Sequence, residues 1–203
     1  MTDAKRSRRL DAIRKRDADR LEASLGRLPK LVRRPALVIL IGLPGSGKSH
    51  FARLLAGRYP AAILDSDALR GVLYESPQHT TQEHARLFPA IRVLTRRLLD
   101  RGVPVVLDAT NLKEANRKPS YRLARDAGAR LVIVRLRAPF AVMRERLAKR
   151  ETARNPLDRS TADLLVLERM RRDYQRPRRP YFVVDTSEDS HQVLDKIVAL
   201  LQS

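Results

Sequence analysis

Residues 42–49 read GLPGSGKS, which matches the phosphate-binding pattern G-x-x-x-x-G-K-[ST]. The glycines at Gly42, Gly45 and Gly47 let the backbone wrap with its amide N–H groups pointing inward, and such a nest attracts anions. A helix beginning near Lys48 would add the positive end of its dipole. The octapeptide therefore predicts a loop that holds the phosphates of a nucleotide.

The side chains of this loop have separate predicted roles. Lys48 supplies a positive charge for the β- and γ-phosphates of ATP, and the Ser49 hydroxyl is a predicted ligand of Mg²⁺. His50 stands where many such loops carry a second Ser or Thr, so we expect its backbone N–H to serve the α-phosphate. The predicted ATP contacts within the loop are Gly42, Pro44, Gly45, Ser46, Gly47, Lys48, Ser49 and His50.

A second polar turn, Asp65-Ser66-Asp67, follows the apolar run 61–64. In a doubly wound sheet this turn lies at the same carboxyl edge as the phosphate loop, so Asp67 is a candidate base for an acceptor hydroxyl. Arg70, one helical turn later, is a candidate ligand for a phosphate of the acceptor. The alternatives are that Asp67 only caps the next helix, and that Asp67 and Arg70 form a surface ion pair.

The apolar run VPVVL at 103–107 ends in Asp108, an acid beside the phosphate loop. That position is suited to holding Mg²⁺ through water, although Asp108 could instead bond neighbouring backbone. Asn111 follows in the same turn, where it either buttresses the turn or reaches the acceptor.

Arg146 and Arg150 are four residues apart and share one face of a predicted helix. Residues 150–160, RETARNPLDRS, have no apolar period and suit a small mobile lid. Arg150 on such a lid would stabilise the charge of a transferring phosphoryl group, with Arg146 as a second ATP contact. The alternative is a solvated basic helix.

The elements that must position these residues alternate regularly along the chain. Five short apolar runs separated by helical patterns predict an α/β fold with a parallel sheet and right-handed crossovers. The expected strands are 36–41, 61–64, 103–107, 131–136 and 181–185. The expected helices are 48–58, 67–74, 83–101, 113–127, 140–149, 161–174 and 191–201. Residues 36–203 are expected to form this domain.

Residues 1–35 form a basic arm with 12 basic and 5 acidic residues. Its sparse apolar residues predict a helix over 3–27, either docked on the domain or serving as a mobile arm for nucleic acid. The whole chain has 42 basic and 23 acidic residues, a net charge of +19, and 34 of the basic residues are arginine. A polyanionic partner such as nucleic acid would suit this excess, and so would an ordinary solvated basic surface.

Several classes of protein are excluded by composition. The absence of cysteine excludes a disulfide-stapled fold, a cysteine-ligated zinc site and a thiol nucleophile. No apolar run is long enough for a transmembrane helix, and the charged N-terminus lacks a signal core, so we expect a cytoplasmic protein without a membrane partner. The sequence leaves the oligomeric state open.

The stretches GLPGSGKS, DSDALR, VVLDATNLKEANRKPSYRLARDAGARLVIVRLRAP and RERLAKR resemble P-loop kinases of the polynucleotide 5′-hydroxyl kinase type. This group of AAA family ATP-binding proteins belongs to a wider set that includes zeta-toxin-like kinases of sugar nucleotides. The resemblance covers residues 36–185 and implies ATP and Mg²⁺ as cofactors. It also implies the P-loop NTPase fold, a three-layer sandwich around a five-stranded parallel sheet with strand order 2-3-1-4-5. It implies that Asp67 is the general base, that Arg70 grips the phosphate beside the acceptor hydroxyl, and that Arg150, with Arg146 as its neighbour, contacts the phosphates of ATP.

Together these observations predict an ATP-dependent kinase that transfers the γ-phosphoryl group to a hydroxyl. The 5′-hydroxyl end of RNA or DNA is the expected acceptor because the positive charge suits a polyanion. The alternatives are a zeta-toxin-like or small-metabolite kinase and a nucleotide-gated nucleic-acid-binding ATPase.

Overall fold

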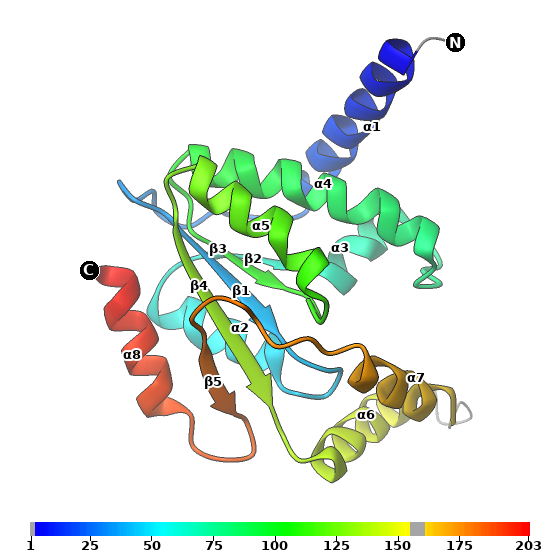
Figure 1. Ribbon diagram of the computed structural model, residues 1–203, viewed down its shortest axis with the longest axis vertical. Coiled ribbons are helices and arrows are strands. Elements are labelled where there is room, and N and C mark those ends of the chain that lie inside the picture. Colours follow the sequence, from blue (N-terminus) through cyan, green and yellow to red (C-terminus); the bar gives the residue numbers. More distant parts are fainter. Residues whose placement is uncertain (1–2, 155–160) are drawn as a thin grey trace.

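The computed structural model describes the backbone of residues 3–154 and 161–203, and the side chains of residues 5–149 and 166–203. Its centre is a parallel sheet with strand order β2-β3-β1-β4-β5, as predicted (Figure 1). The strands are β1 (Ala36–Ile41), β2 (Ala62–Asp65), β3 (Val105–Asp108), β4 (Arg130–Arg137) and β5 (Phe182–Asp185).

The helices lie close to their predicted ranges. They are α1 (Asp3–Ala23), α2 (Lys48–Arg58), α3 (Ser66–Leu73), α4 (Thr81–Asp100), α5 (Glu114–Asp126), α6 (Phe140–Arg154), α7 (Thr161–Arg172) and α8 (His191–Gln202). The largest difference is in α6, which continues to Arg154, so the first part of the predicted lid is helical.

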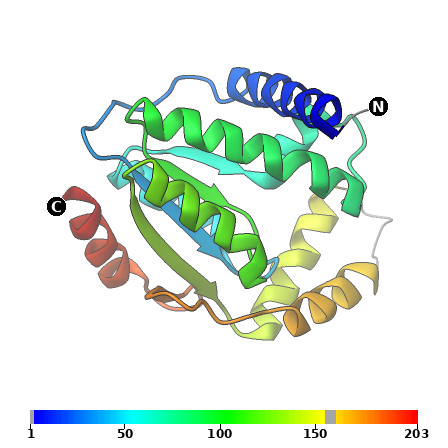
Figure 2. The same ribbon diagram turned by 45° about the horizontal axis from the view of Figure 1, so that its top comes forward.

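The three predicted layers follow from the alternation of side chains along the buried strand β1. Leu37, Ile39 and Ile41 face the layer formed by α1, α3, α4 and α5. Leu40 and Val38 face α2 and α8 on the other side of the sheet. Figure 2 shows α4 and α5 side by side over one face, with α1 outside them. Every residue of β1 is buried because both faces are covered.

The second half of α1 is docked on the domain. Ala18 and Leu21 are fully buried in the core, and the buried Asp17 accepts two hydrogen bonds from Arg86 of α4, at 2.7 and 2.8 Å. The side chains of residues 5–12 are exposed. The prediction of a helix docked on the domain is therefore correct for the second half of α1. The first half presents its basic residues to solvent.

Candidate nucleotide and acceptor site

The phosphate loop joins β1 to α2 and can be built only with glycine at several positions. Gly45 and Gly47 have φ of 76° and 82°, which favour glycine over residues with a Cβ. A Cβ at Gly45 would also lie 2.6 Å from the Met143 carbonyl of α6, and one at Gly42 would lie 2.4 Å from Ser46 Oγ. The loop is therefore held in a tight wrap, with α6 packed against it.

The side chains of the loop are placed around this wrap. Lys48 Nζ donates to the Leu43 carbonyl at 3.0 Å, and Ser46 is buried with a hydroxyl oxygen that has no partner among the described residues. Ser49 is half-buried in the first turn of α2, whereas the side chain of His50 is exposed. The polar groups expected to meet a triphosphate thus share one short segment.

Asp108 lies at the carboxyl end of β3 and pairs in register with Asp65 of β2. Burial raises the pKa of Asp108, a hydrogen bond from Ser49 and the charge of Lys48 lower it, and the charges of Asp65 and Asp67 raise it further. The register of β2 and β3 places Asp65 and Asp108 at one edge of the sheet, and Ser49, Lys48 and Asp67 lie close enough to act on the Asp108 carboxyl. Their charges interact because the edge is partly shielded from water.

The site residues fit ATP with Mg²⁺. Asp108 is 3% exposed and one of its carboxylate oxygens has no hydrogen-bond partner among the described residues. That oxygen and the Ser49 hydroxyl are ligands of the type Mg²⁺ prefers. In the described part of the chain no three His, Asp or Glu side chains form a metal site by themselves. The ion would therefore be held by these two residues together with phosphates and water.

Asp67 does not cap helix α3. The helix begins at Ser66, and the Asp65 carboxylate accepts hydrogen bonds from the backbone N–H groups of Asp67 and Ala68, at 2.9 and 3.3 Å. The capping alternative for Asp67 is therefore wrong, because Asp65 caps the helix two residues before the expected cap. Asp67 is exposed on the first turn of α3.

Arg70 lies deeper than the sequence led us to expect. It is 1% exposed, and its Nη1 donates to Glu83 Oε2 at 3.1 Å, so the alternative of a surface ion pair with Asp67 is wrong. Glu83 comes from α4 and also accepts from the Gln78 backbone N–H at 2.8 Å. Arg70 Nε is buried with no hydrogen-bond partner in the described structure. The role of Arg70 towards an acceptor stays a prediction.

Asn111 was predicted either to buttress the turn after β3 or to reach the acceptor, and in the structure its side chain buttresses the turn. Its backbone has φ of 47°, and its buried side-chain Nδ2 donates to the Leu40 carbonyl at 2.8 Å. This bond ties the turn after β3 to the end of β1. Asn111 thus supports the edge that carries Asp108, and its contact with an acceptor remains untested.

Arg146 braces the phosphate loop. Its Nη1 donates to Thr186 Oγ1 at 2.7 Å and to the Gly45 carbonyl at 3.3 Å, and its Nη2 donates to the Thr186 carbonyl at 2.8 Å. Thr186 Oγ1 in turn donates to the Ser46 carbonyl at 3.1 Å. Arg146 therefore fastens the loop to the turn after β5. The side chain of Arg150 and the lid segment 155–160 lie outside the described residues.

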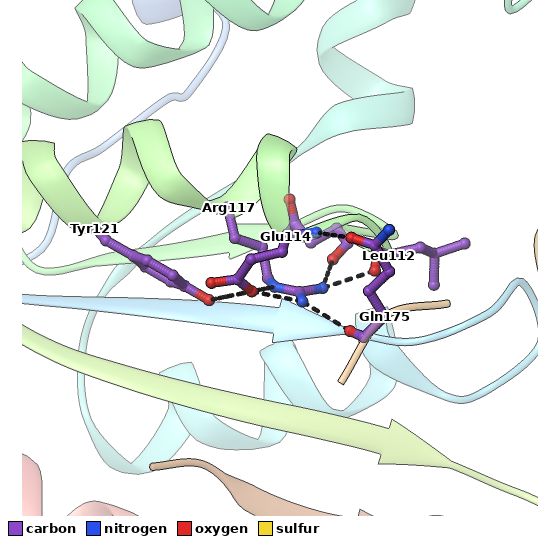
Figure 3. Close-up of polar contacts among 6 residues, drawn as sticks. Leu112, Glu114, Arg117, Tyr121 and Gln175 are labelled. Atoms are coloured by element: carbon purple, nitrogen blue, oxygen red, sulfur yellow. Dashed lines mark hydrogen bonds and ion pairs between the residues drawn. The ribbon is translucent and has the colours of Figure 1, made fainter. Parts of the chain in front are cut away.

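A residue that the sequence analysis missed, Arg117 of α5, forms the centre of the polar network in Figure 3. It is fully buried, and its Nη1 donates to the carbonyls of Asn111 and Leu112, at 2.6 and 2.8 Å. Its Nη2 donates to Glu114 Oε2 and to the Gln175 carbonyl, both at 2.7 Å. Arg117 therefore joins the turn after β3 to the segment after α7.

The available sequence signal for Arg117 was weak. Glu114, Arg117 and Tyr121 share one helix face by their i, i+3 and i, i+4 spacing, and the structure buries all three. Such spacing also occurs on solvated helices, and Gln175 is far away in the sequence.

A glycine-rich loop between the first strand and its helix, in a parallel sheet of this order, defines a P-loop nucleotide-binding protein of the kinase fold. A family model described as "AAA domain" matches residues 37–177. The chain belongs to this family of P-loop kinases, and ATP and Mg²⁺ are its cofactors. No helix in the described part of the chain has the length and apolar character needed to cross a membrane.

Two curated relatives are similar in sequence. The chain is 32% identical over 108 residues to the adenylyl-sulfate kinase of Myxococcus xanthus, a match covering 51% of this chain and 58% of that protein. It is 25% identical over 169 residues to a probable adenylyl-sulfate kinase of Aeropyrum pernix, covering 79% of this chain and 88% of that protein. The first match thus spans less than two thirds of the relative.

Solved structures share the fold at lower identity. A Mycobacterium tuberculosis APS kinase in complex with AMPPNP and APS has a TM-score of 0.64 and 22% identity, covering 84% of this chain and 99% of that one. Chaetomium thermophilum Kti12 in complex with ADP-AlF3 has a TM-score of 0.62 and 22% identity, covering 81% and 98%. These comparisons do not support the narrower expectation of a polynucleotide kinase.

Proposed function

We propose that this protein is an ATP-dependent kinase that transfers the γ-phosphoryl group to a hydroxyl of a small anionic metabolite. The observation that carries the proposal is the sheet edge where the ends of β2 and β3 bring Asp65 and the buried Asp108 together, with Ser49 and Lys48 of the phosphate loop acting on the Asp108 carboxyl. Adenylyl sulfate is the first acceptor to test, because both curated relatives bear the name adenylyl-sulfate kinase.

When bound, ATP with Mg²⁺ supplies an activated phosphoryl group whose charge the metal partly neutralises. Lys48 would exchange its bond to the Leu43 carbonyl for the phosphates, and Ser49 and Asp108 would hold the ion. Because Asp65 caps helix α3, the Asp67 carboxylate is not needed as the cap. Asp67 would orient the acceptor hydroxyl and take its proton. Arg146 keeps the loop in place, and Arg150 is proposed to reach the transferring group from α6.

A second candidate acceptor is the 5′-hydroxyl end of RNA or DNA. The observation in its favour is the net charge of +19, which would attract a polyanion. Salt separates the two candidates, because nucleic-acid affinity falls steeply with ionic strength and the affinity for a small acceptor falls less.

The test offers γ-labelled ATP to the full chain with a panel of acceptors: adenylyl sulfate, nucleotide sugars, other small alcohols, and 5′-hydroxyl RNA and DNA. Labelling of a small acceptor supports the proposal, and labelling of nucleic acid alone favours the second candidate. Hydrolysis of ATP with no labelled acceptor would indicate a nucleotide-gated ATPase instead.

The role of Asp67 is tested with Asp67→Asn. We expect turnover to fall by about 100-fold or more while ATP binding is retained, because the base is lost and the phosphate loop is untouched. Glu75→Gln is the matched control, since it makes the same charge change at an exposed position after α3. Turnover of Asp67→Asn equal to that of the control would remove Asp67 from the mechanism.

A further inference from the structure

An open groove of about 480 Å³ lies between the first half of α1 and the middle of α4, away from the phosphate loop. The groove is lined by Asp11, Arg14, Lys15, Pro89, Arg92, Val93, Arg96 and Arg97. Figure 1 shows α1 above α4, whereas α6 and α7 lie at the other end of the molecule. Any ligand of this groove would therefore bind apart from the site of phosphoryl transfer.

Positive charge in the groove is only partly neutralised. Arg14 pairs with Asp11, Arg96 with Asp100, and Arg97 with Asp19 and Glu22. Within the described part of the chain, neither Lys15 nor Arg92 pairs with a carboxylate. Partial burial lowers the pKa of Arg92, and the nearby charge of Arg14 lowers it further. An anion between these side chains would offset their mutual repulsion.

The basic residues extend beyond the groove in both directions. Exposed basic side chains continue along α1 towards its N-terminus at Lys5, Arg6, Arg8 and Arg9. A helix rises about 1.5 Å per residue, so the series from Lys5 to Lys15 spans roughly 15 Å. The linker after α1 adds Arg27, Lys30, Arg33 and Arg34, and no acidic residue occurs between Glu22 and Asp65. Such an extended series matches regularly spaced phosphates better than one small anion.

The surroundings argue for nucleic acid over an anionic membrane. On the described part of α1, Leu10 is the only large hydrophobic side chain that is strongly exposed, so the helix offers little apolar surface to lipid. The opposite layer has a shorter basic series, since α2 carries Lys48, Arg53 and Arg58 and α8 carries only Lys196 beside Asp195 and His191. Residues 1–35 hold 12 basic and 5 acidic residues, so a substantial share of the excess charge lies on the α1 side.

We propose that the groove between α1 and α4, with the basic series along α1, binds the phosphate backbone of a nucleic acid. The contacts are guanidinium and ammonium groups to phosphate oxygens, which position a strand without reading its sequence. The excess of 12 basic over 5 acidic residues in residues 1–35, one part of the net charge of +19, is then explained by a surface away from the acceptor site. A kinase of a small metabolite and a nucleic-acid-binding surface can coexist in one chain.

The experiment measures the binding of a short fluorescein-labelled single-stranded RNA to the full chain by anisotropy, over a series of salt concentrations. The test variant is Lys15→Ala/Arg92→Ala, and the matched control is Arg53→Ala/Lys196→Ala, which removes the same charge from exposed positions on α2 and α8. We expect the test variant to bind about 10-fold more weakly and its log–log salt slope to fall by about 1.4, the value for two lost phosphate contacts. The control should stay within about 2-fold of the wild type.

Arg92 is half-buried, so a second variant guards against misfolding. Arg14→Glu/Lys15→Glu changes only exposed side chains and should weaken RNA binding at least as strongly. An equal loss in the α2/α8 control, or no RNA binding by the wild type at low salt, would overturn the proposal. So would preferential binding to phosphatidylserine vesicles. Phosphotransfer to a small acceptor, assayed without RNA, should be unchanged in the groove variants, so the two proposals fail independently.

Discussion

Two buried arginines, Arg117 and Arg70, lie on the same side of the sheet and have different surroundings. All three guanidinium nitrogens of Arg117 donate hydrogen bonds, to Glu114, Tyr121 and backbone carbonyls from two segments. Arg70 donates from Nη1 to Glu83, and its buried Nε has no partner in the described structure. A buried cation whose donors are all satisfied maintains structure, whereas one with an unsatisfied donor is available to a ligand.

The positions of the two residues agree with this difference. Arg117 fastens the turn that contains Asn111 to the segment at Gln175. Arg70 follows Asp67 by one turn of α3, beside the sheet edge where the acceptor is proposed to bind. The comparison shows that two equally buried arginines differ in how fully their donors are satisfied, and we expect this difference to separate a structural arginine from one that binds a ligand.

The largest expected effect is that of Arg117→Met on stability. The substitution leaves the Glu114 carboxylate and several carbonyls buried without their donor, so we expect the free energy of unfolding to fall by about 3–5 kcal/mol. Urea denaturation followed by circular dichroism measures it, with the exposed neighbour Lys118→Met as the control. A loss below about 1 kcal/mol would mean that the network is dispensable.

Arg70→Met should lower the free energy of unfolding less than Arg117→Met does, but it should weaken binding of the acceptor more. Glu83 keeps the backbone N–H of Gln78, so we expect the free energy of unfolding to fall by only about 2 kcal/mol. If Arg70 holds the acceptor, the KM for the acceptor should rise about 10-fold or more, with the KM for ATP little changed. An unchanged acceptor KM would make Arg70 a structural residue like Arg117 and remove the contrast between them.

A third prediction concerns pH and the partner of Arg70. The hydrogen bond from the backbone N–H of Gln78 lowers the pKa of Glu83 below the ordinary value of 4.5, and the hydrogen bond from Arg70 lowers this pKa further. A depressed folded-state pKa stabilises the protein above the unfolded-state pKa, and this contribution is lost as the pH falls through the folded-state value. The stability advantage of the wild type over Glu83→Gln should therefore shrink on acidification below 4.5. Glu75→Gln, at an exposed position, should show no such trend.

The phosphate loop and the sheet could be predicted because their signals are local. Glycines at 42, 45 and 47 next to a fully apolar strand determine both a backbone shape and its place at the sheet edge. The alternation of strands and helices predicts a parallel sheet with right-handed crossovers, whereas the strand order was expected from the resemblance to P-loop kinases. The acidic edge was also predicted, because Asp65 and Asp108 each end an apolar run.

The partners of the two arginines could not be predicted, because they depend on tertiary packing. Glu83 is 13 residues from Arg70, and Gln175 is 58 residues from Arg117, and no local pattern marks either pair. The helix cap was misassigned for a smaller reason. Asp65 and Asp67 are both suitable caps, and the choice between them depends on a two-residue shift of the helix start.

The smallest expected effect is that of Tyr121→Phe, which tests how far the Arg117 network relies on each partner. The Tyr121 hydroxyl accepts from Arg117 Nε at 3.2 Å, and the same Nε also donates to Glu114 at 2.9 Å. Because Arg117 keeps a partner for every nitrogen, we expect a loss of only about 0.5–1 kcal/mol in the free energy of unfolding. A loss near that of Arg117→Met, measured in the same urea titration, would show that the network fails as a unit when any one member is removed.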